Sequence, residues 1–241
     1  MRVAVVSDVH GNLTALEAVI ADISAVGADQ VVCGGDLVGS GSSPAEVIDR
    51  VRSLKWPAIF GNTDEMLWKP QRVAEILGAP HFRRLRDVLV GEIIPWTLTA
   101  IGGERVAWLQ ALPDRWSSGG VAVVHASPGD AWRSPMGNAS DAEMERVYGP
   151  LGASVVVHGH THQPFVRPLA TFTLANAGSV SLSYDGDMRA SYALVAGDGV
   201  TIRRVAYDVD QESSRLAAVG HPQAGWIADT LRAAAFVPLP E

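Results

Sequence analysis

Cysteine is nearly absent from this sequence: Cys33 is the only one among 241 residues. An internal disulfide framework is therefore excluded, and a reducing compartment is expected. Long apolar runs are also missing, since none approaches the ~18 residues that a membrane-spanning helix needs. The apolar run at the N-terminus is short and is interrupted by Asp8, which is not the pattern of a signal peptide. We therefore expect a cytoplasmic protein with no membrane association.

Positive charge is scarce. Lys and Arg number 19 against 26 Asp and Glu, which gives a net charge of -7. Nonspecific binding to nucleic acid depends on a basic face, so a polymeric nucleic acid is not the expected substrate. The one basic segment, residues 81–86, is interpreted as a solvated helix face in preference to a phosphate contact. An anionic substrate would need positive charge from another source, such as metal ions.

Hydrophobic residues make up 47% of the chain and charged residues 19%, as in a globular protein with a sizeable core. Apolar, mostly β-branched runs predict buried strands at residues 2–7, 31–33, 57–60, 121–124 and 155–157. Helices are predicted from Leu13 to Gly27, at 44–54, over most of 65–112, and in a short acidic segment within 129–150. Short strands at 172–176, 190–195 and 200–207 predict antiparallel hairpins that extend a second sheet, followed by a helical tail. We expect an α/β protein with one domain over residues 1–241.

The densest group of metal-ligand side chains is the segment Val156-Val157-His158-Gly159-His160-Thr161-His162. A strand would project its three alternate imidazoles on one face, because the side-chain period of a strand is two. Neutral imidazole is a common ligand of borderline metals. A polar strand end with hydrogen-bonded histidines is the structural alternative, but the clustered spacing favours a metal site.

Other predicted strands also end in side chains that can bind metal. In open α/β sheets this carboxyl edge is where ligands bind. The candidate ligands, with those of the histidine segment, are Asp8, His10, Asp36, Asn62, His125, His160 and His162. They are too many for one tetrahedral zinc. They suit two divalent ions ~3.5–4 Å apart that share one carboxylate, for which Asp36 is the natural bridge. Mixed nitrogen and oxygen donors favour Mn, with Fe, Zn, Co or Ni as alternatives, over Mg or Ca.

The order D-x-H, G-D, G-N, H, G-H-x-H over residues 1–164 resembles the calcineurin-like metallophosphoesterase family. Gly178-Ser179-Val180 and Asp185-Gly186 extend the likeness, toward the family's small prokaryotic phosphodiesterase-like branch, to about residue 207. The resemblance implies a four-layer αββα sandwich of two mixed sheets flanked by helices. It also implies a dinuclear phosphoesterase in which a hydroxide bridging the ions attacks a phosphodiester or a nucleotide-type phosphate ester.

The resemblance also implies a role for each residue. Asp8, His10 and His162 would hold one metal, Asn62, His125 and His160 the other, and Asp36 would bridge them. Asn62, Asp64 and His125 are the candidate catalytic residues. His158 would lie outside the ligand set, as a core histidine or as a hydrogen-bond partner of a ligand. Pairing of His158 with His160 is the alternative that the spacing leaves open.

Thr63 departs from the family pattern, because many members have a histidine there that protonates the leaving group. A threonine hydroxyl cannot act as a general acid near neutral pH. Either the enzyme prefers good leaving groups, or Asp64 or His158 supplies the proton, or the activity is weak. Asp64 could equally be an acid that favours the N-terminus of a helix.

Thr63 also leaves a second function open, a metal-bound regulatory or binding module with little turnover. A nuclease is a third, weaker interpretation. Trp68, Trp96 and Trp132 could stack a base, although core packing is the expected role of each. An oligomer remains possible.

Overall fold

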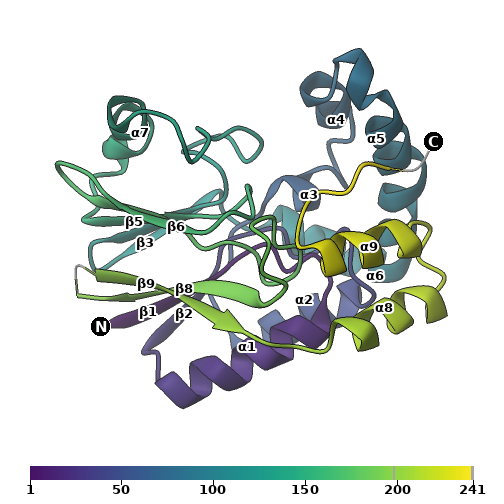
Figure 1. The fold of residues 1–241 in the computed structure, drawn as a ribbon, viewed down its shortest axis with the longest axis horizontal. Helices are drawn as coiled ribbons and strands as arrows, with labels where there is room; N and C mark the ends of the chain where they lie inside the picture. Colours follow the sequence, from purple (N-terminus) through teal and green to yellow (C-terminus); the bar gives the residue numbers. More distant parts are fainter. Residues whose placement is uncertain (198, 240–241) are drawn as a thin grey trace.

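A computed structural model describes residues 1–197 and 199–239 of the chain. Two mixed β-sheets lie face to face, and helices cover both outer sides (Figure 1). The first sheet has the order β2-β1-β8-β9 and the second the order β3-β4-β5-β7-β6. The expected four-layer αββα sandwich is thereby confirmed. The strands are β1 Arg2–Val6, β2 Gln30–Cys33, β3 Arg115–Ser118, β4 Val121–Val124, β5 Val155–His158, β6 Phe165–Pro168, β7 Thr173–Asn176, β8 Ala190–Ala196 and β9 Gly199–Val205.

The layers follow from the alternation of side chains along the apolar strands. In β1, Val3 and Val5 join the core between the two sheets, while Ala4 and Val6 face the helices outside the first sheet. The second sheet alternates in the same way, with Val157 of β5 between the sheets and Val156 packed against the outer helix α7 (Asp141–Tyr148). Strands buried on both faces need apolar residues at every position, which explains the continuous runs in the sequence.

The helices divide between the two outer faces. On the first sheet, α1 (Leu13–Val26) and α2 (Pro44–Leu54) pack against the core, and on the second sheet α7 does so. The others are α3 Asn62–Glu65, α4 Gln71–Ile76, the 3-10 turn η1 Pro80–Phe82, α5 Arg83–Val88, the π-helical turn η2 Leu89–Ile93, α6 Ile94–Gln110, the 3-10 turn η3 Gly149–Leu151, α8 Val209–Ala218 and α9 Ala224–Ala233. Helix α6 is interrupted at Gly102, where the backbone leaves the helical region.

Two sequence-based expectations about strands were wrong. The predicted strand at 57–60 is only a bridge between Ala58 and Cys33, because the segment makes a single pair of ladder hydrogen bonds with β2 before it turns away. The hairpin of β8 and β9 does not extend the second sheet. It joins the first, where β8 pairs antiparallel with β1. Strand neighbours depend on long-range pairing, which local patterns do not encode.

Strands β3 and β6 were not predicted from the sequence. Both are short edge strands of the second sheet, and their side chains are mostly exposed or half-buried, so they lack an apolar signal.

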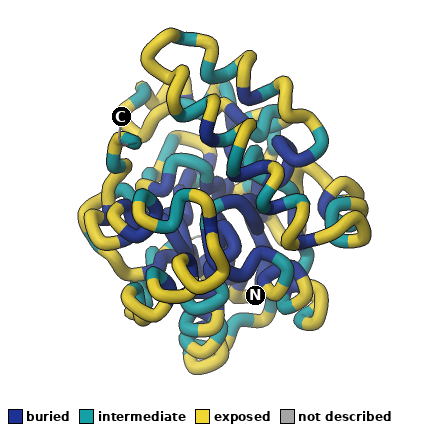
Figure 2. Tube along the Cα trace, turned by 90° about the vertical axis from the view of Figure 1, so that its right-hand side faces the viewer, coloured by how far each residue is buried: buried dark blue, intermediate teal, exposed yellow. Residues whose placement is uncertain are grey.

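The buried chain segments gather at the centre of the molecule (Figure 2). Within residues 1–197 and 199–239, none of the helices combines the length and the apolarity that crossing a membrane would require.

Candidate metal centre

The candidate site lies where the loops after β1 and β2 run side by side. The two strands are parallel, with Val6 paired to Cys33, so both chains leave the sheet at the same edge. Backbone hydrogen bonds continue beyond the strands, from Asp8 N to Gly35 O at 3.0 Å and from His10 N to Asp36 O at 2.8 Å. Parallel pairing thus brings the predicted ligands of two distant sequence motifs together.

The backbone at the candidate ligands is unusual. Seven non-glycine residues in the described part of the chain have positive φ, and five of them are candidate ligands: Asp8, His10, Asp36, His160 and His162. This left-handed region is sparsely used by residues with a side chain, and such strain concentrates at functional sites. The left-handed backbone also explains why His160 and His162 of the histidine segment face the centre. Strand β5 ends at His158, and the left-handed turns at His160 and His162 aim their rings at the centre.

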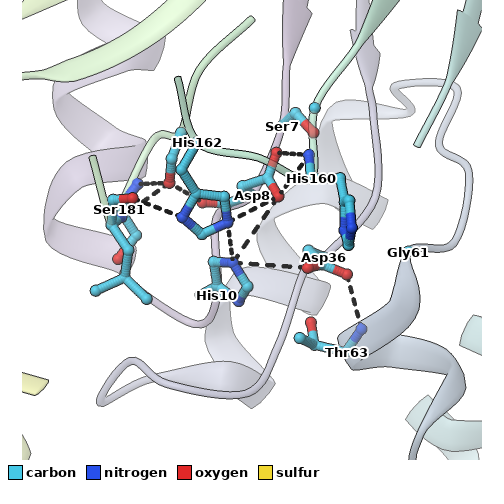
Figure 3. A network of polar contacts seen from close by, with 12 residues as sticks. Ser7, Asp8, His10, Asp36, Gly61, Thr63, His160, His162 and Ser181 are labelled. Carbon is cyan, nitrogen blue, oxygen red and sulfur yellow. Dashed lines mark hydrogen bonds and ion pairs between the residues drawn. The ribbon is translucent and has the colours of Figure 1, made fainter. Parts of the chain in front are cut away.

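One group of donor atoms comes from Asp8, His10 and His162 (Figure 3). His162 Nε2 lies 3.1 Å from Asp8 Oδ1 and 3.1 Å from His10 Nε2. His162 Nδ1 donates to the carbonyl of Leu182 at 2.6 Å, so in the neutral ring the lone pair is on Nε2 and faces the centre. With Asp36, these residues each offer one ligand atom, and the four atoms lie within 4.8 Å of one another. This set is therefore able to hold a divalent metal ion.

A second group comes from Asn62, His125 and His160. Asn62 Oδ1 lies 3.0 Å from His125 Nε2 and 2.8 Å from His160 Nδ1. His125 Nδ1 donates to the carbonyl of Gly34 at 2.9 Å, which turns its Nε2 toward the centre. Asp36 lies between the two groups, with Oδ1 3.4 Å from His125 Nε2 and Oδ2 3.6 Å from His10 Nε2. Each carboxylate oxygen of Asp36 therefore faces a different group of donors.

The charges of the centre suit cations. Burial opposes the ionisation of Asp36 and Asp8, but the neighbouring imidazoles outweigh it and lower the pKa of both carboxyls. Burial lowers the pKa of His10, and it lowers the pKa of His160 to about 4, which leaves both rings neutral at pH 7. Burial also opposes the charged form of His125, but the charge of Asp36 raises its pKa to about 10. Metal binding at pH 7 would therefore displace a proton from His125.

The second sheet closes the centre through Gly159. The backbone N–H of His160 donates to both oxygens of Asp8, each at 3.1 Å, and thereby links the two sheets. A Cβ at Gly159 would overlap Oγ of Ser7 and Oδ2 of Asp8, so only glycine permits this approach. The glycine between two histidines in the sequence is thus a packing requirement of the centre.

Thr63 and Asp64 make mainly backbone contacts. Thr63 N donates to Asp36 Oδ1 at 2.8 Å, and the Thr63 hydroxyl donates to the carbonyl of Val38 at 2.8 Å. Asp64 is fully buried, and its carboxylate accepts from the backbone N–H groups of Leu37, Val38 and Gly61 at 2.9–3.2 Å. Burial and the charge of Asp36 raise the pKa of Asp64 to about 7. Asp64 therefore ties the loop after β2 to the start of α3.

His158 points away from the centre. It stacks on Tyr148 with ring centroids 5.2 Å apart, packs edge-on against Phe165, and accepts from Asn176 Nδ2 at 3.2 Å. Burial lowers its pKa to about 3. Strand alternation explains this placement, because His158 shares the outer face of β5 with Val156. This geometry matches a core histidine.

The tryptophans and the basic segment have separate places. Trp132 is buried, lines the cavity above the centre and donates from Nε1 to Glu65 at 2.6 Å. Trp68 packs edge-on against Phe60, and Trp96 packs against His221. Residues 83–84 of the basic segment are exposed, as a solvated helix face would be, whereas Leu85 of the same segment lines the cavity.

A cavity of about 350 Å³ opens over the centre. His10, Asp36, Asn62, His160 and His162 contribute to its lining. Tyr184, which the sequence reasoning missed, also lines it and stacks on His162, with ring centroids 4.6 Å apart and the planes at 23°. The sequence analysis used only Asp185-Gly186 of this turn, and nothing in the local sequence placed Tyr184 near the histidines. The volume lies within the range of small-molecule sites.

Known proteins share the sequence pattern of this chain. The family model of the calcineurin-like phosphoesterase superfamily domain matches residues 1–199. An uncharacterized protein of Methanocaldococcus jannaschii is 27% identical over 252 residues, which cover 95% of this chain and 96% of that protein.

Two solved structures share the fold of this chain. The crystal structure of a metallophosphoesterase from Sphaerobacter thermophilus aligns with a TM-score of 0.78 at 29% identity, covering 97% of this chain and 99% of the other. A hypothetical protein from Pyrococcus horikoshii aligns with a TM-score of 0.82 over 98% of this chain and 99% of its own, and at 18% identity it supports the fold alone.

Proposed function

The chain belongs to the calcineurin-like phosphoesterase superfamily, and we propose that it is a dinuclear metal-dependent phosphoesterase. Its substrate is a small phosphodiester or a nucleotide-type phosphate ester, and Mn is the metal that we expect in both positions. The Sphaerobacter thermophilus relative, described as a metallophosphoesterase, supports the metal dependence. The single, buried Cys33 supports a reducing compartment, which we propose is the cytoplasm.

The position of Asp36 carries the proposal. Its two oxygens lie 3.4 and 3.6 Å from imidazoles that belong to different donor groups. A carboxylate placed in this way can be shared by two cations, whereas a single ion would leave one group without a role. Asp8, His10 and His162 would hold one ion, and Asn62, His125 and His160 the other. Two bound ions would lower the pKa of a water molecule and neutralise phosphoryl oxygens.

The residues around the two ions would orient the metal ligands and stabilise the charge of the transition state. The carbonyls of Leu182 and Gly34 fix the rings of His162 and His125, so these side chains need little rearrangement when substrate arrives. Asn62 directs its Oδ1 at the two imidazoles and leaves its amide nitrogen for a phosphoryl oxygen. Donors held in place before reaction contribute most where the negative charge of the transition state develops.

Protonation of the leaving group has no obvious donor near Asn62. The Thr63 hydroxyl already donates to the carbonyl of Val38, and the Asp64 carboxylate already accepts from backbone N–H groups. We therefore propose that Asp64 positions the two loops, and that the enzyme favours leaving groups that depart without a proton, such as activated phenolates.

The test compares an aryl phosphodiester with the matching monoester, in added Mn, for the wild type and the variants His160→Ala and Asp36→Asn. We expect faster diester cleavage, loss of at least about 100-fold in both variants, and about two ions per wild-type chain by metal analysis. The matched control is His81→Ala, since His81 is an exposed histidine outside the centre. It should retain full activity.

Two results would contradict the proposal. Unchanged activity in Asp36→Asn would remove the shared carboxylate from the mechanism. Two bound ions without cleavage of either ester would favour the alternative, a metal-bound regulatory or binding module.

A further inference from the structure

The cavity over the metal centre is lined by polar residues of the centre and by apolar residues from other segments. Ile76, Leu77, Leu85 and Leu89, from the helical segment α4 to η2, contribute to the lining. Trp226 of α9 and Phe236 of the C-terminal tail also line it. These segments are far apart in the sequence, and in Figure 1 the tail runs from the end of α9 toward α5.

The C-terminal tail is held in place over the cavity. Trp226 Nε1 donates to the carbonyl of Val237 at 2.7 Å, and Gly186 N donates to the carbonyl of Ala234 at 3.0 Å. Phe236, which lies between these anchors, is edge-on to Trp226 and to Tyr184, with ring centroids 6.2 Å apart in both pairs. Tyr184 in turn stacks on His162, so aromatic rings lead from the mouth of the cavity to a candidate metal ligand.

Phe236 is 50% exposed, although its side chain is large and apolar. A half-exposed aromatic ring at the mouth of a cavity is available for contact with a bound molecule. Because the tail is hydrogen-bonded on both sides of Phe236, the ring is presented in a fixed place, and little conformational entropy would be lost on binding.

The lining carries little charge apart from the centre. Among the described residues that line this cavity, none is Lys or Arg. The neighbouring cavity, which shares Trp132 and His125 with the site, does contain Lys69 and Arg72. Lys69 pairs with Glu65 at 2.7 Å and Arg72 pairs with Glu75 at 2.7 Å, and neither cation lines the cavity over the centre. Additional phosphate or carboxylate groups on a substrate would therefore meet no Lys or Arg among the described residues that line this cavity.

We propose that the substrate carries a single phosphoryl group, which binds at the metal centre, and an uncharged apolar organic group, which fills the cavity between Leu85, Leu89, Trp226 and Phe236. This inference rests on the proposed function and narrows it. It excludes polyphosphate chains and multiply charged nucleotides, and it selects esters that carry an apolar aromatic or aliphatic group beside an activated leaving group.

The first experiment measures binding of phosphonates, which cannot be hydrolysed, to the Mn-loaded full-length protein by calorimetry. We expect 1-naphthylphosphonate to bind at least about 10-fold more tightly than methylphosphonate, because each apolar group buried in a pocket contributes about that factor. Pyrophosphate should show no such gain. Equal affinity for the two phosphonates, or tighter binding of pyrophosphate, would overturn the proposal.

Variants of the cavity residues test which side chains bind the apolar group. Phe236→Ala should lose about 10-fold in affinity for 1-naphthylphosphonate and keep the affinity for methylphosphonate. Phe82→Ala removes an exposed phenylalanine outside the cavity and should change neither. Leu85→Arg should reverse the preference, toward 4-carboxyphenylphosphonate. If Phe236→Ala binds both phosphonates as the wild type does, the tail has no part in recognition and the proposal is wrong.

The two proposals fail differently. Tight naphthylphosphonate binding to a protein that cleaves no ester would support the apolar site and contradict the enzymatic function. Hydrolysis of the 4-nitrophenyl esters of methylphosphonate and 1-naphthylphosphonate, which share one leaving group, with equal kcat/KM would support the enzyme and contradict the apolar preference.

Discussion

The hydroxyl of Thr63 donates a 2.8 Å hydrogen bond to the backbone carbonyl of Val38. The side chain therefore belongs to the scaffold of the loop after β2, although Thr63 lines the cavity. Its backbone N–H, by contrast, contacts Asp36 directly at 2.8 Å. The backbone at this position thus supports the metal centre, while the side chain offers no proton to a leaving group.

A histidine at position 63 should restore general-acid catalysis. We expect Thr63→His to raise kcat for an alkyl ester, a poor leaving group, by up to about 100-fold, with little change for a nitrophenyl ester. The measurement is the dependence of kcat on the pKa of the leaving alcohol, which should become shallower. Thr63→Ser keeps the hydroxyl and serves as the control. A parallel gain for all esters would mean that the histidine acts in some other way.

Gly159 should tolerate no side chain. The Cβ of Gly159→Ala would overlap Ser7 and Asp8. This overlap would push the two sheets apart at the centre, so we expect the free energy of unfolding to fall by about 3 kcal/mol. Denaturant unfolding measures this, and metal content should fall in parallel. Gly91→Ala is the matched control, because a Cβ there meets no atom within 4 Å. A fully stable Gly159→Ala that binds metal normally would refute the packing argument.

Asp64→Asn tests whether Asp64 positions loops or donates a proton. An amide cannot accept from all three backbone N–H groups, and the loss should cost about 2 kcal/mol of unfolding free energy. A positioning role predicts an equal loss of kcat for good and poor leaving groups together with weaker Mn binding. A proton donor predicts loss for poor leaving groups only. Asp87→Asn, at an exposed carboxylate, is the control.

His221 should make stability depend on pH. The ring is buried against Trp96, and burial lowers its pKa to about 4. In the unfolded chain the pKa is about 6.5, so protonation favours unfolding between these values. The stability is fully present above pH 6.5 and is lost as the pH falls toward 4, by up to about 3 kcal/mol.

The measurement is the unfolding free energy of the wild type and of His221→Phe at pH 7 and pH 4.5. The wild type should lose more stability than the variant over this interval. The same replacement at the exposed His81 is the matched control. Parallel curves for wild type and His221→Phe would show that His221 does not titrate in this range.

The sequence by itself was sufficient to predict the main strands and the chemistry of the candidate site. Strands buried on both faces require unbroken apolar runs, and β1, β4 and β5 carry them. Metal-ligand side chains directly after such runs indicate a site at the strand ends, since parallel strands present their carboxyl ends at one edge. These are local signals, and they were enough to name Asp8, Asp36 and His125 as candidates.

Other features depended on contacts between distant residues. The sequence could not place β8 beside β1, because strand partners are chosen by the packing of whole layers. His158 and His160 look equivalent in sequence, yet strand alternation turns one into the core and a left-handed backbone turns the other toward Asn62. Tyr184 and Phe236 reach the cavity only because segments that are distant in the sequence from Asp36 return to the centre. Residue types thus determined which chemistry is possible, whereas tertiary packing decided which side chains meet, because distances across the fold are set by the whole chain.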